Sequence, residues 1–405
     1  MKIYRVGGAV RDAILGLPVK DIDYVVIGSS PEQMVAAGYT PVGNDFPVFL
    51  HPVTRAEYAL ARTERKSAPG YRGFIFHCAP DVTLEQDLLR RDLTINAMAI
   101  AENTEQGTTA EQTIIDPFGG QRDLFNRVFR HVSPAFSEDP VRILRVARFS
   151  ARFYEFSIAP ETMELMRSMV AAGEVDALVS ERVWQEIARG LMESRPSRLF
   201  ETLRESRALV RVMPELDRLW EDHMSNSASS DHGGQLWHGV DYAADCHQTL
   251  AVRWATILIE LSSATFSEVS VEPVNAAPLL SLCMRLKVPT EVRDVALIAC
   301  KEHRHICNLT SLSADSVVKL LERCDAFRRP ERLTEIVQSV RCHYLLSPSD
   351  FIQHEFLERA RAAALSIPSG LIAQTTAQRF PQQPRRIAEA IFDARVAAIQ
   401  NLQPL

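Results

Sequence analysis

Short apolar runs alternate with turn-forming residues over the first sixty positions of the chain. Four of these runs have the length and composition of β-strands, at residues 3–6, 24–27, 48–51 and 58–61. Clusters of glycine, proline, serine and asparagine separate them, at residues 16–18, 28–31 and 42–45. This alternation predicts a small mixed sheet with flanking helices.

From residue 84 onward, apolar positions recur mainly at helical spacing to the end of the chain. A stretch rich in Ser, Asn, Asp and Gly, residues 224–234, is the best candidate for a linker. The pattern predicts an α+β fold, in which a small N-terminal head of mixed sheet and helices precedes a long all-α body. We place domains at residues 1–136, 137–223, 224–340 and 341–405.

Composition narrows the class of protein. The chain has 405 residues, too many for one ordinary core, and a formal net charge of −6, which argues against a broadly basic coat for nucleic acid. A local basic stripe can still bind RNA. The seven cysteines include no C-x-x-C pair, which argues against a disulfide framework or a zinc knuckle. No run of about 18 apolar residues occurs and the chain begins with a strand pattern, so we expect a cytoplasmic protein that contacts no membrane.

The residues with the clearest chemistry lie near the start of the chain. Gly7 and Gly8 end the first strand pattern, and Arg11 follows one turn later. Asp21 and Asp23 open the second strand pattern, where residues two apart point to one face and would present paired carboxylates suited to Mg²⁺. Glycines let the backbone approach a phosphate, and an arginine adds a charged fork. A plain turn is the simpler explanation of the glycine pair, and a solvated acidic pair is the simpler explanation of the two aspartates. Taken together, the two motifs predict nucleotidyl transfer.

Two further groups of polar residues could complete this site. Glu57 opens the fourth strand pattern, where a third carboxylate would orient metal ions or accept a proton; a solvent-facing charge is the alternative. Residues 88–99 have the pattern of an amphipathic helix, in which Asp92 and Asn96 share a face beside Arg91. We interpret this cluster as a nucleotide contact, against the alternative of a surface ion-pair patch.

Residues 137–149 predict a helix with an arginine-rich face. Pro140 suits the first helical position, which would make Asp139 the N-cap. Arginines recur on one face of this helix, at Arg142, Arg145, Arg148 and Arg152. A solvated basic face is the alternative, but arginine without lysine favours bidentate recognition, so side chains alone could select a nucleotide.

These ordered motifs resemble those of bacterial CCA-adding enzymes. These enzymes are tRNA nucleotidyltransferases of the class that includes bacterial poly(A) polymerases, within the DNA polymerase beta-like nucleotidyltransferases. The resemblance covers residues 1–220 and continues more weakly beyond them. It implies template-independent addition of C, C and A to the 3′ end of tRNA from CTP and ATP, with Mg²⁺ as cofactor and no obligate protein partner.

The resemblance also assigns roles to residues. Asp21 and Asp23 would be catalytic and hold the metal. The nucleotide-binding residues would be Gly8, Arg11, Arg91, Asp139, Arg142, Arg145 and Arg148. Residues 1–136 would be the nucleotidyltransferase head and 137–223 a nucleotide-selecting neck, and the loop at 62–81 would correspond to the family's flexible loop.

Some of these enzymes carry a metal-dependent His-Asp phosphohydrolase domain in the helical half, and here the match fails. His238 stands where a first ligand could fall, but Ile259-Glu260 replaces the His-Asp pair. His303 remains, although scattered histidines in a helical domain are ordinary core or surface residues. We therefore predict that residues 224–340 keep the scaffold without hydrolase activity, and that residues 341–405 form a helical tail region.

Three rival functions stay open to test. A poly(A) polymerase shares the head motifs, although the acidic charge and the lack of a basic tail argue against it. A partial enzyme that adds only CC or only A is a second alternative. A catalytically idle RNA-binding module is a third, and the intact acidic pair argues against it.

Overall fold

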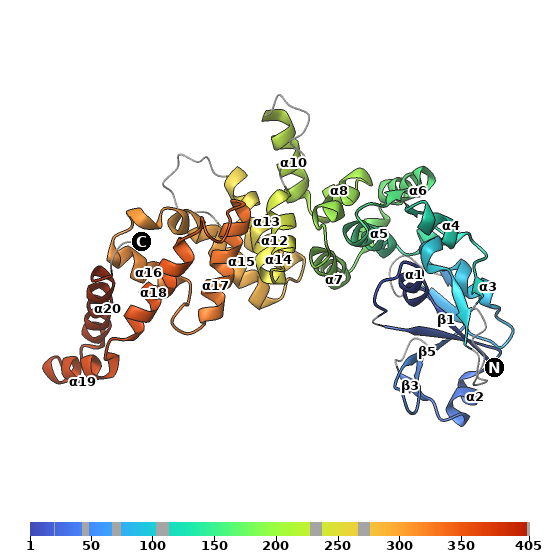
Figure 1. Cartoon of the computed structure of the whole chain (residues 1–405), viewed down its shortest axis with the longest axis horizontal. Helices are drawn as coiled ribbons and strands as arrows, with labels where there is room; N and C mark the ends of the chain where they lie inside the picture. Colours follow the sequence, from blue (N-terminus) through green and yellow to red (C-terminus); the bar gives the residue numbers. More distant parts are fainter. Residues whose placement is uncertain are drawn as a thin grey trace. The chain divides into compact units, whose positions relative to one another are not determined.

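The chain forms two compact units. The structure, a computed structural model, describes residues 1–19, 21–42, 48–66, 74–102, 113–226, 237–265 and 276–402. The first unit comprises Met1–Val183 with Phe200–Val212, and the second comprises Trp184–Leu199 with Met213–Leu405. Every strand that the structure describes belongs to the first unit, and the described part of the second is helical, which confirms the predicted α+β fold (Figure 1).

The first unit is built on a mixed sheet. The strands of the chain are β1 (Lys2–Val6), β2 (Asp23–Ile27), β3 (Thr40–Val42), β4 (Val48–Leu50), β5 (Glu57–Leu60), β6 (Thr63–Lys66), β7 (Phe74–His77), β8 (Ala99–Ala101), β9 (Ile114–Ile115), β10 (Val128–Phe129) and β11 (Ser157–Ile158). Seven of them form one sheet in the order β3-β4-β5-β2-β1-β8-β9. Neighbours are antiparallel except for the parallel pair β2 and β5. The four predicted strands correspond to β1, β2, β4 and β5.

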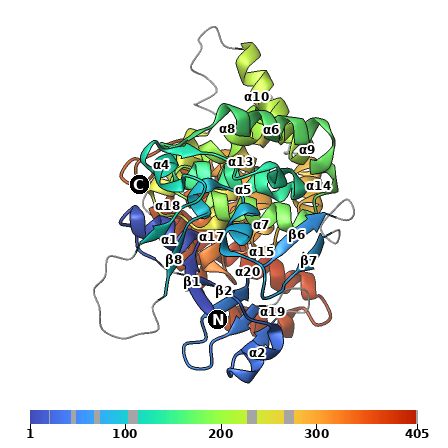
Figure 2. The same cartoon turned by 90° about the vertical axis from the view of Figure 1, so that its right-hand side faces the viewer.

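The segment 62–81 contains regular structure that the sequence did not predict. β6 and β7 pair as a separate antiparallel hairpin, with Thr63 opposite His77 (Figure 2). The expectation of an irregular loop was therefore wrong for these strands, whose Phe74-Ile75-Phe76 run has high β propensity. Residues 67–73, at the tip of the predicted loop, lie outside the described residues.

Helices cover both faces of the large sheet. The helices of the first unit are α1 (Gly8–Ile14), α2 (Pro31–Ala36), α3 (Leu84–Leu89), α4 (Gly120–Phe125), α5 (Val141–Arg152), α6 (Pro160–Ala171) and α9 (Leu209–Val212), with 3-10 turns η1 (Thr94–Asn96), η2 (Pro134–Glu138) and η3 (Glu174–Ala177). Strand residues alternate between faces. One face packs Val6 and Val25 against Leu88 of α3 and Ala97 after η1, and the other packs Val26 against Met34 of α2.

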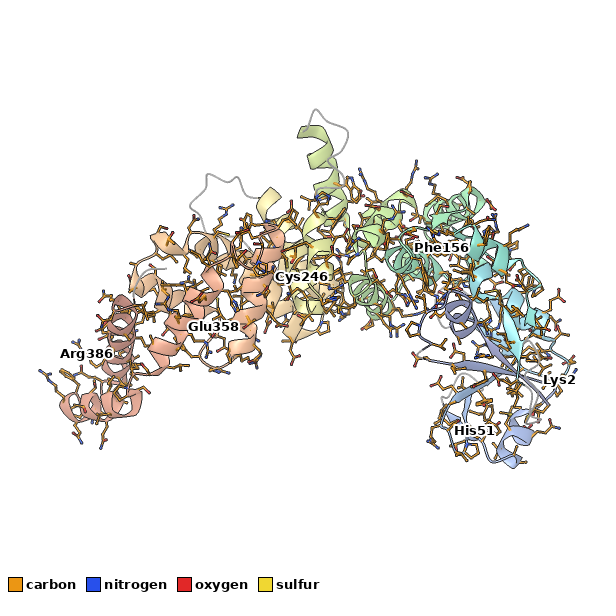
Figure 3. All side chains as sticks on the ribbon, viewed as in Figure 1. Lys2, His51, Phe156, Cys246, Glu358 and Arg386 are labelled. Carbon is orange, nitrogen blue, oxygen red and sulfur yellow. The ribbon has the colours of Figure 1, made fainter. Side chains whose placement is uncertain are left out.

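Aromatic side chains join α5 to the segment that follows it. The Phe156 ring lies 5.1 Å from Phe129 and 5.4 Å from Phe153, centroid to centroid (Figure 3). These rings anchor the C-terminal end of α5, which carries the arginine-rich face.

The second unit is an array of helices. α7 (Ser180–Leu191) and α8 (Ser197–Glu205) each have residues in both units. The other helices are α10 (Pro214–Asn226), α12 (His238–Asp245), α13 (Leu250–Thr265), α14 (Ala277–Arg285), α15 (Thr290–Cys307), α16 (Ala314–Arg323), α17 (Pro330–His343), α18 (Gln353–Leu365), α19 (Ser369–Arg379) and α20 (Pro384–Gln400), with the 3-10 turn η4 (Leu309–Ser311). The predicted linker 224–234 begins inside α10, and its residues 227–234 lie outside the described part of the chain.

The described core of this unit is mainly aliphatic and includes buried tryptophans. Trp254 is fully buried and meets the ring of Trp184 edge-on, with 5.2 Å between centroids. Among the described helices, none combines the length and the apolar composition needed to cross a bilayer.

Candidate active site

The turn between β1 and α1 depends on a glycine at position 7. Gly7 has φ 70° and ψ −133°, a conformation that side chains strongly disfavour, and its N–H donates to the carbonyl of Met98 at 3.2 Å. A Cβ at this position would lie 2.8 Å from Nη1 of Arg91. Arg91 therefore lies directly against the turn because residue 7 has no side chain. The sequence singled out Gly8, whereas the structure makes Gly7 the stricter position.

Two carboxylates begin neighbouring strands at the end of the sheet beside this turn. Asp23 is the first residue of β2 and pairs with Val6, the residue before Gly7. Glu57 is the first residue of the parallel strand β5. Tyr24 and Tyr58, one residue further along, are register partners whose rings stack 4.4 Å apart. Because side chains alternate, Asp23 and Glu57 project together from the opposite face, which is the face that packs on η1.

Asp21 is exposed but lies two residues before β2, outside any strand. Asp21 and Asp23 were predicted to share one face of a single strand. The structure instead puts Asp23 and Glu57 on one face, from two neighbouring strands. All three carboxylates are exposed, and none has an ion-pair partner within the described residues.

Arg91 is held by a buried carboxylate. Asp87 on α3 is fully buried and accepts from Nη2 of Arg90 at 2.6 Å and Nη2 of Arg91 at 3.2 Å. Burial alone would raise the pKa of Asp87, but the charges of Arg90 and Arg91 hold it below its usual value. Nη1 of Arg91 has only a long contact, 3.5 Å, with the carbonyl of Asn96. This arrangement fixes the guanidinium beside Gly7.

The predicted helix over residues 88–99 is wrong. α3 ends at Leu89, and the 3-10 turn η1 and strand β8 follow. Residues 92–99 are all buried, so this part of the segment has no solvated face and its apolar pattern carries no reliable period. Asp92 and Asn96 nevertheless meet, because the turn brings Nδ2 of Asn96 within 3.0 Å of Oδ1 of Asp92.

Arg11 points into the protein. It is 3% exposed, and its guanidinium carbon lies 5.2 Å from the Phe149 ring and 5.1 Å from the Phe153 ring. Nε donates to Asp12 at 2.9 Å and Nη1 donates to Asn96 at 2.6 Å. Burial lowers the pKa of Arg11, and Asp12 opposes that effect. The direct contact with triphosphate stays a prediction, and this environment favours an indirect role.

The arginines of α5 divide into inner and outer members. Arg142 is 8% exposed and donates to the carbonyls of Ala135 at 3.0 Å and Arg90 at 2.7 Å. Arg145 and Arg148 are partly exposed, and Arg148 lies over the Phe149 ring at 4.8 Å. The arginine face is therefore partly buried and held by hydrogen bonds, and it is not a uniformly solvated stripe.

Asp139 precedes α5 and remains partly exposed. The helix begins one residue later than the pattern predicts, at Val141, with Pro140 as the N-cap. The Asp139 carboxylate still accepts the Val141 N–H at 3.1 Å, and it also accepts from Nη2 of Arg182 at 3.2 Å. Asp139 thus fixes the start of the helix on which the arginines lie.

Relatives are found over nearly the whole chain. Residues 3–130 match the poly A polymerase head domain family, and residues 155–219 match the probable RNA and SrmB-binding site of polymerase A. The chain is 53% identical to the multifunctional CCA protein of Janthinobacterium sp. (strain Marseille), over 98% of this chain and 97% of that protein. This chain belongs to the multifunctional CCA protein family. The member from Herminiimonas arsenicoxydans is 52% identical over 98% of this chain and 97% of its own length.

Solved structures share the fold of this chain. The CCA-adding enzyme of Bacillus stearothermophilus in complex with CTP covers 98% of this chain and 88% of its own, with a TM-score of 0.70 and 24% identity. The Thermotoga maritima CCA-adding enzyme complexed with tRNA-CCA covers 100% of this chain and 88% of its own, with a TM-score of 0.65 and 21% identity. The fold and the family resemblance predicted from sequence are both confirmed.

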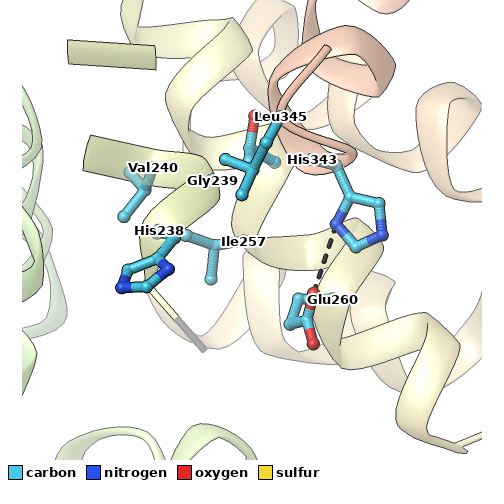
Figure 4. A pocket seen from close by; sticks show the side chains of 8 residues that line it. His238, Gly239, Val240, Ile257, Glu260, His343 and Leu345 are labelled. Atoms are coloured by element: carbon cyan, nitrogen blue, oxygen red, sulfur yellow. Dashed lines mark ion pairs between the residues drawn. The ribbon is translucent and has the colours of Figure 1, made fainter. Parts of the chain in front are cut away.

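The second unit holds a small polar pocket of about 40 Å³. It is lined by His238, Gly239, Val240, Thr256, Ile257, Glu260, His343 and Leu345. Oε2 of Glu260 lies 3.2 Å from Nδ1 of His343, on the other side of the pocket from the His238 ring (Figure 4). Burial raises the pKa of Glu260 to about 7, and burial together with His303 lowers that of His343 to about 4.

Sequence reasoning missed several residues that build these sites. His343 lies more than eighty positions from Glu260, and no spacing rule could have paired them. Asp12 and Asp87 are ordinary acids in helical segments until the tertiary structure buries them against arginines. The Gly-Gly pair was the one available signal, and only the position of Arg91 shows which glycine matters.

Proposed function

We propose that this chain adds C, C and A to the 3′ end of tRNA without a template, using CTP and ATP and releasing pyrophosphate. The observation that carries the proposal is that the Gly7–Gly8 turn, Arg91, Asp23 and Glu57 lie at the same end of three neighbouring strands, β1, β2 and β5. Relatives over half identical along nearly the whole chain are CCA proteins. The terminal hydroxyl of the RNA attacks the α-phosphorus of the bound nucleotide, and pyrophosphate leaves.

Asp21 and Asp23 are the proposed magnesium ligands, with Glu57 as a further carboxylate beside them. Their exposed oxygens are hard ligands of the kind that Mg²⁺ prefers. Among the described residues no group of three or more His, Cys, Asp or Glu could enclose a metal. Mg²⁺ commonly takes one or two carboxylates and completes its shell with water and substrate phosphates, so an open carboxylate pair fits it. When bound, the ion would lower the pKa of the attacking hydroxyl and neutralise charge on the leaving phosphates.

The other residues bind and select the nucleotide. The backbone at Gly7 and Gly8 admits the triphosphate closely, and Arg91 supplies a fixed positive charge beside it. On α5, Arg145 and Arg148 with Asp139 present donors and an acceptor to the base. Arg142 contributes by tying α5 to the carbonyl that follows α3, which sets the distance between base and triphosphate contacts.

One incubation series tests the proposal and separates its rivals. A tRNA transcript that lacks CCA is incubated with Mg²⁺ and each nucleoside triphosphate, alone and in combination. We expect two C additions followed by one A. A long A tract would instead indicate a poly(A) polymerase, C alone or A alone a partial enzyme, and no addition an idle RNA-binding module.

We also propose that the second unit lacks phosphohydrolase activity. The His-Asp pair of the hydrolase type is replaced by Ile259, which is fully buried, and Glu260, which is paired with His343. A buried isoleucine cannot ligate a metal, so the ligand set is incomplete even though the relatives are called multifunctional. Assay for metal-stimulated phosphatase and cyclic phosphodiesterase activity checks this; robust turnover that His238→Ala abolishes would overturn it.

A cytoplasmic location and the four functional regions complete the proposal. All seven cysteines are free thiols, which supports a reducing compartment. Regions 1–136, 137–223, 224–340 and 341–405 remain our functional division, although the compact units place residues 137–183 with the head.

A further inference from the structure

Asn96 lies at the centre of a series of hydrogen bonds between α1 and α5. Its Oδ1 accepts from Nη1 of Arg11 at 2.6 Å, and its Nδ2 donates to Oδ1 of Asp92 at 3.0 Å. Asn96 is only 6% exposed, so water competes weakly for either bond. One rigid amide supplies both the acceptor that faces the guanidinium and the donor that faces the carboxylate. Neither an ionised aspartate nor an apolar residue can do both.

Asp92 extends the series to α5. Its Oδ2 accepts from Nε of Arg145 at 2.7 Å, and Nη2 of the same guanidinium lies 2.7 Å from it. Burial alone would raise the pKa of Asp92, but Arg145, Asn96 and Arg142 hold it well below its usual value. A lowered pKa keeps the carboxylate charged at neutral pH, where it can hold both partners.

The two ends of the series differ in accessibility. Arg11 is buried one turn after Gly7 and Gly8, whereas the Arg145 side chain is 36% exposed on the nucleotide-selecting face of α5. Three directly bonded contacts thus run from the turn that would receive the triphosphate to a side chain that would meet the base.

A second link between the same helices bypasses Asn96. Nη2 of Arg152 donates to Oδ2 of Asp12 at 2.9 Å, and Asp12 also pairs with Arg11. α1 and α5 therefore remain joined when Asn96 is replaced, so the role of Asn96 can be separated from simple attachment.

We propose that Asn96 is a positioning residue for nucleotide selection: by holding Arg11 and Asp92 it couples the glycine turn to Arg145. The inference rests on the proposed nucleotidyl transfer. Asp92 and Asn96 then act from the interior, in place of the direct nucleotide contact that the sequence suggested.

Replacement of Asn96 by alanine has a matched control in the same 3-10 turn. Thr94 is buried and its hydroxyl donates to Asp123 at 2.7 Å, outside the series. Thr94→Val therefore removes one buried hydrogen bond without touching Arg11, Asp92 or Arg145. For both variants, kcat and KM are measured for CTP, UTP, ATP and GTP on tRNA substrates that lack CCA or only the final A.

We expect Asn96→Ala to lower the preference for CTP over UTP by about tenfold or more, the effect of losing hydrogen bonds to charged groups, and to lower kcat more than it raises KM. Thr94→Val should change that preference by less than about twofold. A merely structural role for Asn96 would give the two variants the same nucleotide preference.

Asn96→Asp adds a pH readout. An ionised carboxylate at this position accepts from Arg11 but repels Asp92, whereas a protonated one donates its O–H to Asp92 and restores the series. Relative to wild type at the same pH, its nucleotide preference should recover about threefold or more between pH 8 and pH 6. Asn96→Ala should show no such recovery.

The outcomes separate this inference from the function beneath it. A wild-type protein that incorporates no nucleotide refutes the nucleotidyl transfer itself. A wild type that incorporates C and A, with Asn96 variants that match Thr94→Val at every pH, refutes only the coupling. Should Asn96→Ala fail to fold, the presence or absence of pH recovery in Asn96→Asp decides.

Discussion

At position 7 a hydrogen in place of a side chain lets a guanidinium lie against the backbone. The same turn is flanked by Val6, whose register partner is Asp23. A single residue thus connects the arginine that would hold the triphosphate with the strand pair that carries the acids. The position of Arg91 therefore depends on the absence of a side chain at residue 7.

Gly7→Ala should reduce nucleotide incorporation by about a hundredfold, because the new Cβ would lie 2.8 Å from Nη1 of Arg91 and displace it. Gly16→Ala is the matched control, since Gly16 also has a positive φ, 66°, but nothing lies within 4 Å of its Cβ position. Both variants place a side chain at a positive φ and bear a conformational cost, which is larger at position 7 because its ψ of −133° lies outside the left-handed helical region; calorimetry measures that cost separately from activity. Equal activity in the two variants would contradict the role of Arg91.

Asp23→Asn should abolish incorporation, by at least about a hundredfold, and leave tRNA affinity within about twofold, because the metal contributes several kcal/mol to the transition state. Glu57→Gln should have a smaller effect in the same assay, since Glu57 assists rather than anchors the ion. Glu164→Gln removes one exposed carboxylate elsewhere in the same unit and controls for charge. Near-normal turnover by Asp23→Asn would remove Asp23 from the catalytic site.

At the scale of the elements, strands, helices and turns place side by side residues that are distant in the sequence. β2 and β5 align Asp23 with Glu57, and η1 brings Asn96 between α1 and α5. In the second unit, α13 and α17 hold Glu260 against His343 in the same way. This last pair makes the stability of the unit depend on pH in two opposing ways.

The stability from protonated Glu260 is complete below its unfolded pKa of about 4.5 and is lost as pH rises through its folded value of about 7. His343 acts oppositely: stability is lost as pH falls from its unfolded value of 6.5 through its folded value of about 4. We expect the wild type to show a shallow profile, because the two trends overlap.

Glu260→Gln should leave the His343 imidazole as the only titrating group of the pair. The free energy of unfolding should then rise by about 1–2 kcal/mol as pH increases from 4 to 6.5. His343→Asn should leave only the carboxyl, so stability should fall between pH 4.5 and 7. Urea unfolding followed by tryptophan fluorescence measures both variants. Profiles identical to that of the wild type would show that neither group titrates as its burial predicts.

At the scale of the whole molecule, the proposed catalytic residues and the tryptophans that report folding by fluorescence belong to different units. The proposed metal ligands lie in the first unit, whereas all four tryptophans, Trp184, Trp220, Trp237 and Trp254, lie in the second. Activity and the folding of the second unit can therefore be read independently in the intact chain.

Chelation of divalent metal by EDTA should abolish nucleotide incorporation and leave the tryptophan-monitored urea midpoint unchanged, because the proposed ligands are remote in the chain from every tryptophan. Mg²⁺ added in excess of the chelator should restore activity. A midpoint that falls on chelation would reveal a structural metal in the second unit and overturn the proposed loss of its metal site.

Much of the head was predictable because its signals are local. Apolar runs predicted β1, β2, β4 and β5, which the structure confirms, and the Gly-Gly and acidic motifs supplied the candidate site residues. The same logic failed over residues 88–99, because its part from residue 92 to 99 is buried throughout and lacks the polar stripe that reveals a period. It also failed to separate Arg142, which caps carbonyls inside, from Arg148, which stays partly exposed.

The sequence by itself determined the order of motifs, the family and the kinds of atoms at the site, because those follow from residue type and short spacing. Only the tertiary structure decided which glycine tolerates no side chain, which arginines face inward, and that Asn96 joins Arg11 to Asp92. Those outcomes depend on burial and on contacts between residues far apart in the chain, such as Arg11 and Asn96, which are 85 positions apart. A polar group that loses its interaction with water on burial needs a partner from another element.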